Sequence, residues 1–413
     1  MSTIKPFRAV RPKAGAAEEI VSLPYDVMNS AEASGMAKGK PNSFLHVSRA
    51  EIDLPIGVDE HSQEVYDKAR ENFYNLIKSG ALVQDDKPYL YIYAQVMNSR
   101  KQVGLVASSS TEDYFNDIIK KHEFTRPEKE KDRINHMQTL QAHVGPIFLT
   151  YRAHSGVDQI IGNYITFNAP AYDITTEDGI QHTVWVVNDE ATIEQLVHLF
   201  ASEIPYTYIA DGHHRAASAA KVGLKIKEQN EKHTGEEEYN FFLSVLFPDN
   251  QLAIMDYNRV VKDLNGLSKD EFLTKVSAAF DLHTTSDIGH PTKLHEFKMY
   301  IDRQWYTLTA KEGTYTNDPI GILDVTILQN NLLAPLLGIA DPRTDKRIDF
   351  VGGIRGLKEL ERRVDTGEMA VAFALYPVSL EQLMDIADSG NVMPPKSTWF
   401  EPKLRDGFFS HLF

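Results

Sequence analysis

The stretch Tyr206-Thr-Tyr-Ile-Ala-Asp-Gly-His-His-Arg215 predicts the fold at the centre of the chain. Residues 206–210 are typical of a short strand, Asp211-Gly212 of a turn, and the alanine-rich sequence from Arg215 to Lys227 of a helix. A strand that turns directly into a helix leaves backbone N–H groups unpaired at the helix start. The sequence therefore predicts a corner at Asp211, where a sheet edge meets a helix N-terminus.

Strands and helices alternate on both sides of this corner. We expect a strand at 182–187, a helix capped by Asn188 that runs to about Glu203, and a buried strand at 241–247. This order predicts helices packed on a sheet, with right-handed crossovers where strands are parallel. The fold class is therefore α/β, a mixed α+β arrangement with a mixed sheet and flanking helices.

Similar patterns continue through the rest of the chain. Residues 89–96 and 102–107 predict a β-hairpin, and Ser268 and Ser379 each open a capping box, a serine that caps a helix together with an acidic or amide residue three positions later. Further helices are expected at 64–78, 113–120, 127–143, 268–280, 322–337 and 379–388, and further strands at 293–301, 305–308 and 369–376.

The length of 413 residues is enough for two or three hydrophobic cores. We expect an N-terminal α+β segment at 1–110, a core that contains the corner at 111–260, and a C-terminal α+β domain at 261–413. Within the last domain, Pro395-Lys-Ser-Thr398 is expected to close the site. Residues 1–57 mix short apolar pieces with Pro, Gly and Ser, and predict no regular structure.

Composition excludes several classes of protein. The chain has no cysteine, which excludes disulfides, a thiolate nucleophile, zinc ribbons and iron–sulfur sites. It has no secretory start and no run of about 18 apolar residues, so we expect a cytoplasmic protein without a membrane segment. The 58 acidic against 43 basic residues give a net charge of −15, which disfavours duplex DNA as a partner. Small anionic ligands remain compatible with this charge, and a homodimer stays open.

The corner is the first candidate site. Its N-terminal helix end binds anions such as phosphate, Gly212 lets a ligand approach the backbone, and His213, His214 and Arg215 add donors. Asp211 is placed to hold a magnesium ion or to accept a proton. The structural alternative is that Asp211 only caps the helix, but three basic side chains at the positive end of a dipole favour a bound anion. Zinc is disfavoured, because the usual four-residue spacing of ligands is missing.

Two other segments carry candidate groups. Glu123, which follows His122, is a candidate general base, and Arg133 follows on the predicted helix beside Lys129. Taken alone, this segment fits a solvated charged surface better than a site. The third candidate group is Lys396, Ser397 and Thr398, whose side chains are suited to bind a phosphate or a carboxylate. An equally good interpretation is that this segment is a packed C-terminal strap anchored by Trp399 and Phe400.

Together these segments resemble the ParB/sulfiredoxin-like superfamily, and most closely its archaeal free L-serine kinases. Full-length bacterial relatives are catalogued as an uncharacterised family under a chromosome-partition (SpoOJ/ParB-type) label. The resemblance covers about residues 115–413, with the longer bacterial family also covering Pro6-Phe-Arg8 and Pro24-Tyr-Asp26. The matching motifs, in the same order, are His122-Glu123, Ile209-Ala-Asp-Gly-His-His-Arg215, Gly367-Glu368 near Ala372-Phe373, and Pro395-Lys-Ser-Thr398.

The resemblance implies transfer of a phosphoryl group to the hydroxyl of free L-serine, which gives O-phosphoserine. Glu123 would take the hydroxyl proton, and Asp211 would assist through magnesium or the nucleophile. The donor is ADP, ATP or pyrophosphate, and no Walker loop or kinase-type glycine-rich loop is present to hold it. The donor phosphates would be held by Gly212, His213, His214, Arg215 and Lys396, with His213 also catalytic, and the substrate by His122, Arg133, Ser397 and Thr398.

Other functions remain open at this point. The direction of the reaction is open, so hydrolysis of O-phosphoserine and the reverse transfer are alternatives, and a further one is a ParB-like nucleotide-binding switch or partition-type protein. The net negative charge and the lack of a basic helix-turn-helix weigh against the switch. Ala216 stands where the archaeal enzymes carry an aromatic residue, and the gap between Glu123 and Asp211 is wide, so contacts near the corner differ. A sulfiredoxin-like role needs a cysteine, and a scaffold leaves the clustered cations unexplained.

Overall fold

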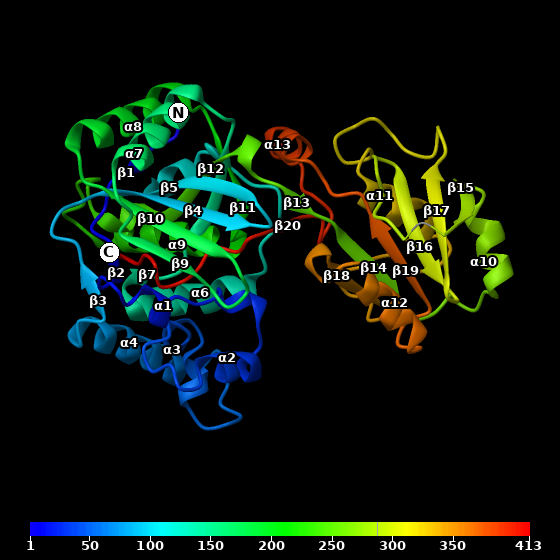
Figure 1. Cartoon of the computed structure of the whole chain (residues 1–413), viewed down its shortest axis with the longest axis horizontal. Helices are drawn as coiled ribbons and strands as arrows, with labels where there is room; N and C mark the ends of the chain where they lie inside the picture. Colours follow the sequence, from blue (N-terminus) through cyan, green and yellow to red (C-terminus); the bar gives the residue numbers. More distant parts are fainter. Residues whose placement is uncertain (287) are drawn as a thin grey trace. The chain divides into compact units, whose positions relative to one another are not determined.

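The chain folds into two compact units in the computed structural model, which describes residues 1–286 and 288–413. The first unit comprises Met1–Leu252 and Pro402–Phe413, and the second comprises Ala253–Glu401. Each unit combines helices with sheet, as Figure 1 shows. The expected mixed α/β class is therefore confirmed.

A nine-stranded sheet is the framework of the first unit. Its strands follow the order β6-β11-β8-β12-β5-β4-β10-β9, and β1 pairs with β5 outside this order. The pairs β11–β6 and β12–β8 are parallel and the others antiparallel, so the expected mixed sheet is confirmed. The bounds are β1 Ile4–Lys5, β4 Leu90–Met97, β5 Arg100–Ser110, β6 Ile119–Lys120, β8 Ile147–Tyr151, β9 Tyr172–Thr175, β10 Gln181–Val187, β11 Thr207–Asp211 and β12 Phe241–Pro248.

The expected hairpin is confirmed as β4 and β5. Met97 pairs with Arg100, so only Asn98 and Ser99 form the turn. Both have positive φ, 50° and 66°, which is the requirement of a type I′ turn and matches the twist of the two strands. β4 is buried on both faces, which explains why Leu90–Ala94 is an unbroken apolar run rather than an alternating one.

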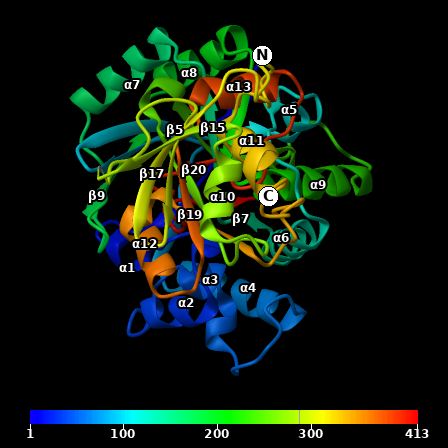
Figure 2. The same ribbon diagram turned by 90° about the vertical axis from the view of Figure 1, so that its right-hand side faces the viewer.

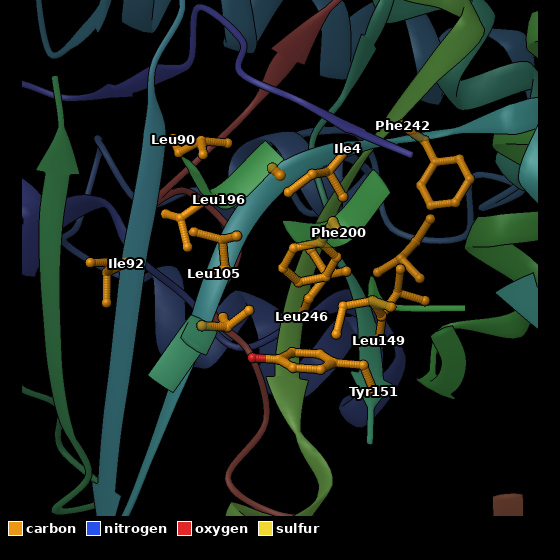
Figure 3. Packing of buried hydrophobic residues seen from close by; sticks show 14 of the residues in the cluster. Ile4, Leu90, Ile92, Leu105, Leu149, Tyr151, Leu196, Phe200, Phe242 and Leu246 are labelled. Atoms are coloured by element: carbon orange, nitrogen blue, oxygen red, sulfur yellow. The ribbon is translucent and has the colours of Figure 1, made fainter. Parts of the chain in front are cut away.

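Helices cover one face of this sheet. Leu196 and Phe200 of α8 (Glu190–Glu203) pack against Leu105 and Leu246 of the central strands, as Figure 3 shows. α7 (Ser155–Phe167) and α9 (His213–Gln229) add residues to the same cluster. On β4 the opposite face carries Tyr91 and Tyr93, whose rings contact Phe409 and Phe408 of the C-terminal segment. The segment 402–413 therefore covers the sheet face that the helices leave open.

The N-terminal helices form a second cluster in the first unit. α4 (Gln63–Lys78) buries Val65, Ala69, Phe73 and Leu76 along one face, and the helix expected at 64–78 is confirmed. Figure 2 shows α2 (Ser30–Ala37), α3 (Leu45–Ser48) and α4 grouped away from α7 and α8. Residues 1–57, for which no regular structure was predicted, contain several short elements. Besides those already named, they include α1 (Ala17–Ile20), β2 (Val10–Pro12) and 3-10 helices at Tyr25–Val27 and Ala50–Asp53. Two further short strands of the first unit are β3 (Leu82–Gln84) and β7 (Ala142–His143).

Two predicted helices near the corner differ in detail. The helix expected at 113–120 is wrong beyond Phe115, because α5 (Thr111–Phe115) ends, Asp117 takes a positive φ of 57°, and Ile119–Lys120 joins the sheet as β6. α6 (Pro127–Leu140) begins at the predicted proline and ends where Gln141 becomes left-handed. The cap of α8 is Asp189 rather than Asn188, because the Asp189 carboxylate accepts a hydrogen bond from the Thr192 amide.

The second unit is built on a six-stranded antiparallel sheet in the order β15-β17-β16-β19-β14-β18. Both predicted capping boxes are confirmed, at Ser268 and Ser379. The helix expected at 322–337 is shorter and changes to a π-helix over Gln329–Leu333. The bounds are β13 Ile254–Met255, β14 Tyr257–Val261, α10 Lys269–Val276, β15 Phe280–Thr285, β16 Glu296–Ile301, β17 Gln304–Ala310, α11 Asp324–Leu328, β18 Ile348–Gly352, α12 Leu357–Asp365, β19 Val371–Leu375, α13 Leu380–Asp388 and β20 Trp399–Phe400.

The sheet of the first unit joins two of the expected segments. β4 and β5 come from the segment 1–110, and they pair with β10 and β12 from the segment 111–260. Separate folding of the three expected segments stays a prediction. In the part of the chain that the structure describes, no helix has the length and apolar character needed to cross a bilayer.

We predict that Phe200→Ala lowers the free energy of unfolding by about 3–5 kcal/mol, because this fully buried ring leaves a cavity between α8 and the sheet. Urea unfolding followed by circular dichroism measures the change. The matched control is Phe167→Ala, since Phe167 is 83% exposed and its loss should change stability by no more than about 0.5 kcal/mol. Equal effects of the two substitutions would contradict the assigned core.

Candidate active site

The predicted corner forms where β11 ends. Asp211 is the last residue of β11, Gly212 is the N-cap of α9, and the helix begins at His213. Gly212 has φ 94°, and a Cβ there would lie 3.0 Å from the Arg215 Nε. The position therefore requires glycine for both its backbone angle and its space.

The Asp211 carboxylate lies between two cations. Its Oδ2 is 3.5 Å from the Lys403 Nζ and 3.5 Å from an Arg215 guanidinium nitrogen. Burial raises the pKa of Asp211, but Lys403 and Arg215 outweigh burial and lower it to about 2. Asp211 is therefore ionised at neutral pH, and its charge is compensated within the first unit.

The Arg215 guanidinium is buried under the corner. One of its terminal nitrogens donates to the Pro146 carbonyl at 2.6 Å, and the other lies 3.8 Å from the Asp26 carboxylate. Its Nε is buried without a hydrogen-bond partner among the described residues. Burial opposes the charge, but Asp26 and Asp211 hold the pKa of Arg215 above its ordinary value. Arg215 therefore supplies a permanent positive charge at this corner.

The loop 122–126 is attached to the first turn of α9 by two histidines. The His122 amide donates to His213 Nε2 at 3.5 Å, and the Arg126 amide donates to His214 Nε2 at 3.0 Å. Because both imidazoles accept hydrogen bonds at Nε2, those nitrogens carry no proton. Burial lowers the pKa of His213 and His214, which favours the same neutral state. Their expected role as phosphate donors stays a prediction.

Glu123 lies between the two attachment points of this loop. Its carboxylate is 3.7 Å from His213 Nδ1, and its side chain is 52% exposed. Since His213 accepts at Nε2, its neutral ring carries its proton at Nδ1, on the side of the carboxylate. His122 itself is buried, its ring centroid lies 4.4 Å from that of His213 in an edge-to-face arrangement, and burial lowers its pKa to about 4. The result is an accessible carboxylate beside the corner, on a loop with fixed ends.

Arg133 lies on α6 and contacts the N-terminal region. Its guanidinium is 2.6 Å from the Asp132 carboxylate and lies 4.0 Å above the Tyr25 ring. Burial raises the pKa of Tyr25 to about 12, so its hydroxyl keeps its proton at neutral pH. Tyr25 is followed by Asp26, whose carboxylate lies 3.8 Å from the Arg215 guanidinium. Arg133 therefore lies near the charged residues of the corner.

The segment 402–413 contributes further charges to the corner. Asp406 is buried, and its Oδ1 has no hydrogen-bond partner among the described residues. A Cβ on Gly145 would lie 3.3 Å from this oxygen and 3.6 Å from the Arg215 Cδ, so the two side chains flank the same glycine. Burial raises the pKa of Asp406 to about 7, against the lowering effect of Arg215.

Lys396, Ser397 and Thr398 belong to the second unit. The Ser397 hydroxyl donates to the Pro394 carbonyl at 2.6 Å, and the Lys396 Nζ lies 5.5 Å above the Tyr257 ring. The Lys396 carbonyl accepts from the buried Arg259 at 3.0 Å. Their expected contact with substrate or phosphate stays a prediction.

The corner does not form a metal site from protein ligands. In the described ranges, no three His, Asp or Glu side chains come close enough together to hold a metal ion. Asp211 offers a single carboxylate that Lys403 and Arg215 already neutralise. Because magnesium is usually bound by one or two carboxylates together with substrate phosphates, the expected role of Asp211 as a magnesium ligand stays a prediction.

Sequence reasoning missed three charged residues of this site, namely Asp26, Lys403 and Asp406. Asp26 and Lys403 lie at the ends of the segments Pro24-Tyr-Asp26 and Trp399-Phe-Glu-Pro-Lys403. The aromatic residues in both segments, which tend to pack against a partner, were the signal present in the sequence. Nothing in the sequence indicated that segments nearly 400 residues apart would meet at Arg215 and Asp211.

We predict that His214→Ala speeds amide hydrogen exchange in the 122–126 loop about fivefold, since one hydrogen bond is worth about 1 kcal/mol. His214→Gln retains a side-chain acceptor and should exchange more nearly like the wild type. Peptides from β16 and β17 in the second unit provide the internal control. Unchanged exchange in His214→Ala would contradict the attachment of the loop.

We also predict a pH effect from Asp406. Its pKa rises from 3.8 in the unfolded chain to about 7 in the folded one, so the folded state binds more protons between these values. The contribution of Asp406 to stability is therefore full below pH 4 and is lost as pH rises to 7. The asparagine side chain cannot ionise, so Asp406→Asn should remove this loss. The free energy of unfolding of the variant, relative to that of the wild type, should therefore increase between pH 5 and 8. Urea unfolding across this range measures it, and parallel curves would refute the assignment.

Comparison with solved structures gives several distant likenesses. A free serine kinase in complex with AMP is 12% identical, with a TM-score of 0.34, over 74% of this chain and 91% of that chain. SbnI with a C-terminal truncation, from Staphylococcus aureus, is 10% identical, with a TM-score of 0.40, over 74% and 87%. A conserved hypothetical protein from Pyrococcus furiosus is 15% identical, with a TM-score of 0.34, over 75% and 95%.

Sequence comparison gives a closer relationship. No curated protein matches the chain. A family described as "protein of unknown function (DUF1015)" matches residues 4–326, which is more than three quarters of the chain and includes Asp211–Arg215. The chain therefore belongs to the DUF1015 family.

Proposed function

We propose that this protein is a phosphotransferase that moves a phosphoryl group to the hydroxyl of free L-serine and so forms O-phosphoserine. The donor is ADP, ATP or pyrophosphate. The observation that carries the proposal is the Glu123 carboxylate, accessible to solvent and 3.7 Å from His213, beside a corner that bears Arg215 and Lys403. The resemblance of the motifs to the archaeal free L-serine kinases of the ParB/sulfiredoxin-like superfamily supports the same reaction.

In this reaction Glu123 takes the proton from the serine hydroxyl. The serine oxygen then forms a bond to the terminal phosphorus of the donor. The bond between that phosphorus and the bridging oxygen breaks, and the departing phosphate or nucleotide keeps the electron pair. Phosphoryl transfer depends mainly on positioning and on positive charge around the moving group, rather than on covalent catalysis by the protein.

The corner offers this positive charge. Arg215 and Lys403 are cations at the end of β11, and the first N–H groups of α9 add the positive end of a helix dipole. We assign the donor phosphates to this end of α9, with Gly212 giving access to the backbone. His213 and His214 would act by holding the Glu123 loop in place. His122, Arg133, Lys396, Ser397 and Thr398 are retained as proposed contacts to substrate or phosphate.

Phosphoserine hydrolysis is the second candidate. Half of the Glu123 side chain is open to water, so the same carboxylate is placed to activate a water molecule instead of a serine hydroxyl. Release of inorganic phosphate from O-phosphoserine without a nucleotide would favour this reaction. Tight, salt-sensitive DNA binding would instead favour the ParB-like switch.

We predict that Glu123→Gln removes nearly all turnover while the protein keeps its folded stability, because the amide cannot accept the hydroxyl proton. The assay incubates the full chain with L-serine, magnesium and each donor in turn, and detects O-phosphoserine by phosphorus NMR. A general base contributes about 100- to 10,000-fold to rate, so the loss should fall in this range.

Glu128→Gln is the matched control, because Glu128 is an exposed carboxylate on the first turn of α6, near the same loop. It should retain the wild-type rate. Near-normal turnover in Glu123→Gln would refute the role of Glu123 as base, and absence of O-phosphoserine with every donor would refute the phosphotransferase proposal itself.

A further inference from the structure

A small cavity opens beside the charged corner, within the first unit. It has a volume of about 220 Å³ and is lined by the Tyr25–Asp26 turn, by α4 and α6, and by the segment around Ala50. The volume is below the roughly 300–1,000 Å³ typical of sites for drug-sized ligands. The cavity therefore suits a small metabolite and leaves no room for a nucleotide.

Asp26 connects this cavity to the corner. Its carboxylate lines the cavity and lies 3.8 Å from the Arg215 guanidinium. Tyr25 and Arg133, stacked at 4.0 Å, line the same wall. A ligand held by Asp26 would therefore lie close to Arg215 and to the first turn of α9.

Most charges around the cavity are already paired with one another. Arg133 pairs with Asp132 at 2.6 Å, and Arg49 pairs with Glu51 at 3.1 Å. Two charges are left for a ligand. Asp26 pairs only with Arg215, through one oxygen at 3.8 Å, and Lys129 has no ion pair among the described residues.

Asp26 and Lys129 bear opposite charges, and both lie near His214. The negative charge of Asp26 raises the pKa of His214, while the positive charge of Lys129 lowers it. A pocket with one available carboxylate and one available ammonium matches a ligand that carries an ammonium and a carboxylate of its own. α-Amino acids are small molecules of this kind.

We propose that this cavity is the binding site for the α-amino acid acceptor. Asp26 binds its α-ammonium group and Lys129 its α-carboxylate, which leaves the side-chain hydroxyl to face Arg215 and Glu123. The inference rests on the proposed phosphotransferase function for its orientation, but amino acid binding is a separate property. Neither Asp26 nor Lys129 is a residue to which the motifs assign a role.

The test is calorimetric titration of the full chain with L-serine in the absence of a donor. Asp26→Asn and Lys129→Ala should each weaken binding by about tenfold or more, since a hydrogen bond to a charged group is worth about 1.5–3 kcal/mol. Lys131→Ala is the matched control, because Lys131 is exposed on the same helix and does not line the cavity; it should bind serine normally. Thermal unfolding verifies that each variant is folded.

Ligand analogues make the assignment specific. Ethanolamine lacks the carboxylate, so its binding should be insensitive to Lys129→Ala, and 3-hydroxypropionate lacks the ammonium, so its binding should be insensitive to Asp26→Asn. L-Alanine should compete with serine, because both anchoring groups are present. In turnover assays, both substitutions should raise the KM for serine and leave the KM for the donor unchanged.

The outcomes separate this inference from the function proposed above. Serine binding that depends on Asp26 and Lys129, without O-phosphoserine from any donor, would support the cavity and refute the phosphotransferase. O-Phosphoserine formation with a normal serine KM in both variants would overturn the cavity and leave the reaction standing. Failure of the wild-type chain to bind serine would overturn the cavity as well.

Discussion

The two hydrogen bonds from backbone amides to imidazole nitrogens determine how this site is built. They join His122 to His213 and Arg126 to His214, so a loop from the middle of the first unit is fixed to the start of α9. Both bonds require neutral, accepting imidazoles, and burial supplies this condition. The position of Glu123 follows from these contacts, because it lies between the two attached residues.

Charge compensation is the second constraint on the corner. Arg215 and Lys403 are held near one another by the carboxylate of Asp211, and Asp26 adds a further negative charge. Removing one partner from such a group leaves a buried charge unpaired, which costs several kcal/mol, on the order of 3–5. The cations at the end of β11 are balanced by these two carboxylates, which come from separate parts of the chain.

Much of the fold was predictable from local pattern. The corner at Asp211, the β4–β5 hairpin, α4 and both capping boxes follow from periodicity and turn chemistry, which act over a few residues. The failures have local and distant causes. The end of the helix expected at 113–120 is instead β6, because it pairs with β11, which lies almost 90 residues later in the sequence. The cap of α8 is one residue later than predicted, because Asn and Asp cap helices equally well.

The sequence predicted which residues form the site better than it predicted the contacts that these residues make. The sequence marked Glu123 and the Asp211–Arg215 corner, but it predicted His213 and His214 as cationic donors at an exposed helix start. Burial of His213 and the approach of loop 122–126 depend on tertiary packing, which no local pattern encodes. The contributions of Asp26, Lys403 and Asp406 escaped prediction for the same reason, because each arrives from a segment distant in sequence.

The first unit is interrupted in sequence by the second, since it resumes at Pro402 after Ala253–Glu401. On the ribosome, the sheet can assemble once β12 has emerged, but Lys403 and the aromatic pair Phe408 and Phe409 are still untranslated at that time. One face of the nascent sheet therefore stays uncovered, and Asp211 lacks one of its cations, until all of the inserted unit has been made. Completion of the corner and of this sheet face thus requires synthesis through at least residue 409, and a product truncated within the inserted unit would expose apolar sheet surface that quality-control chaperones recognise.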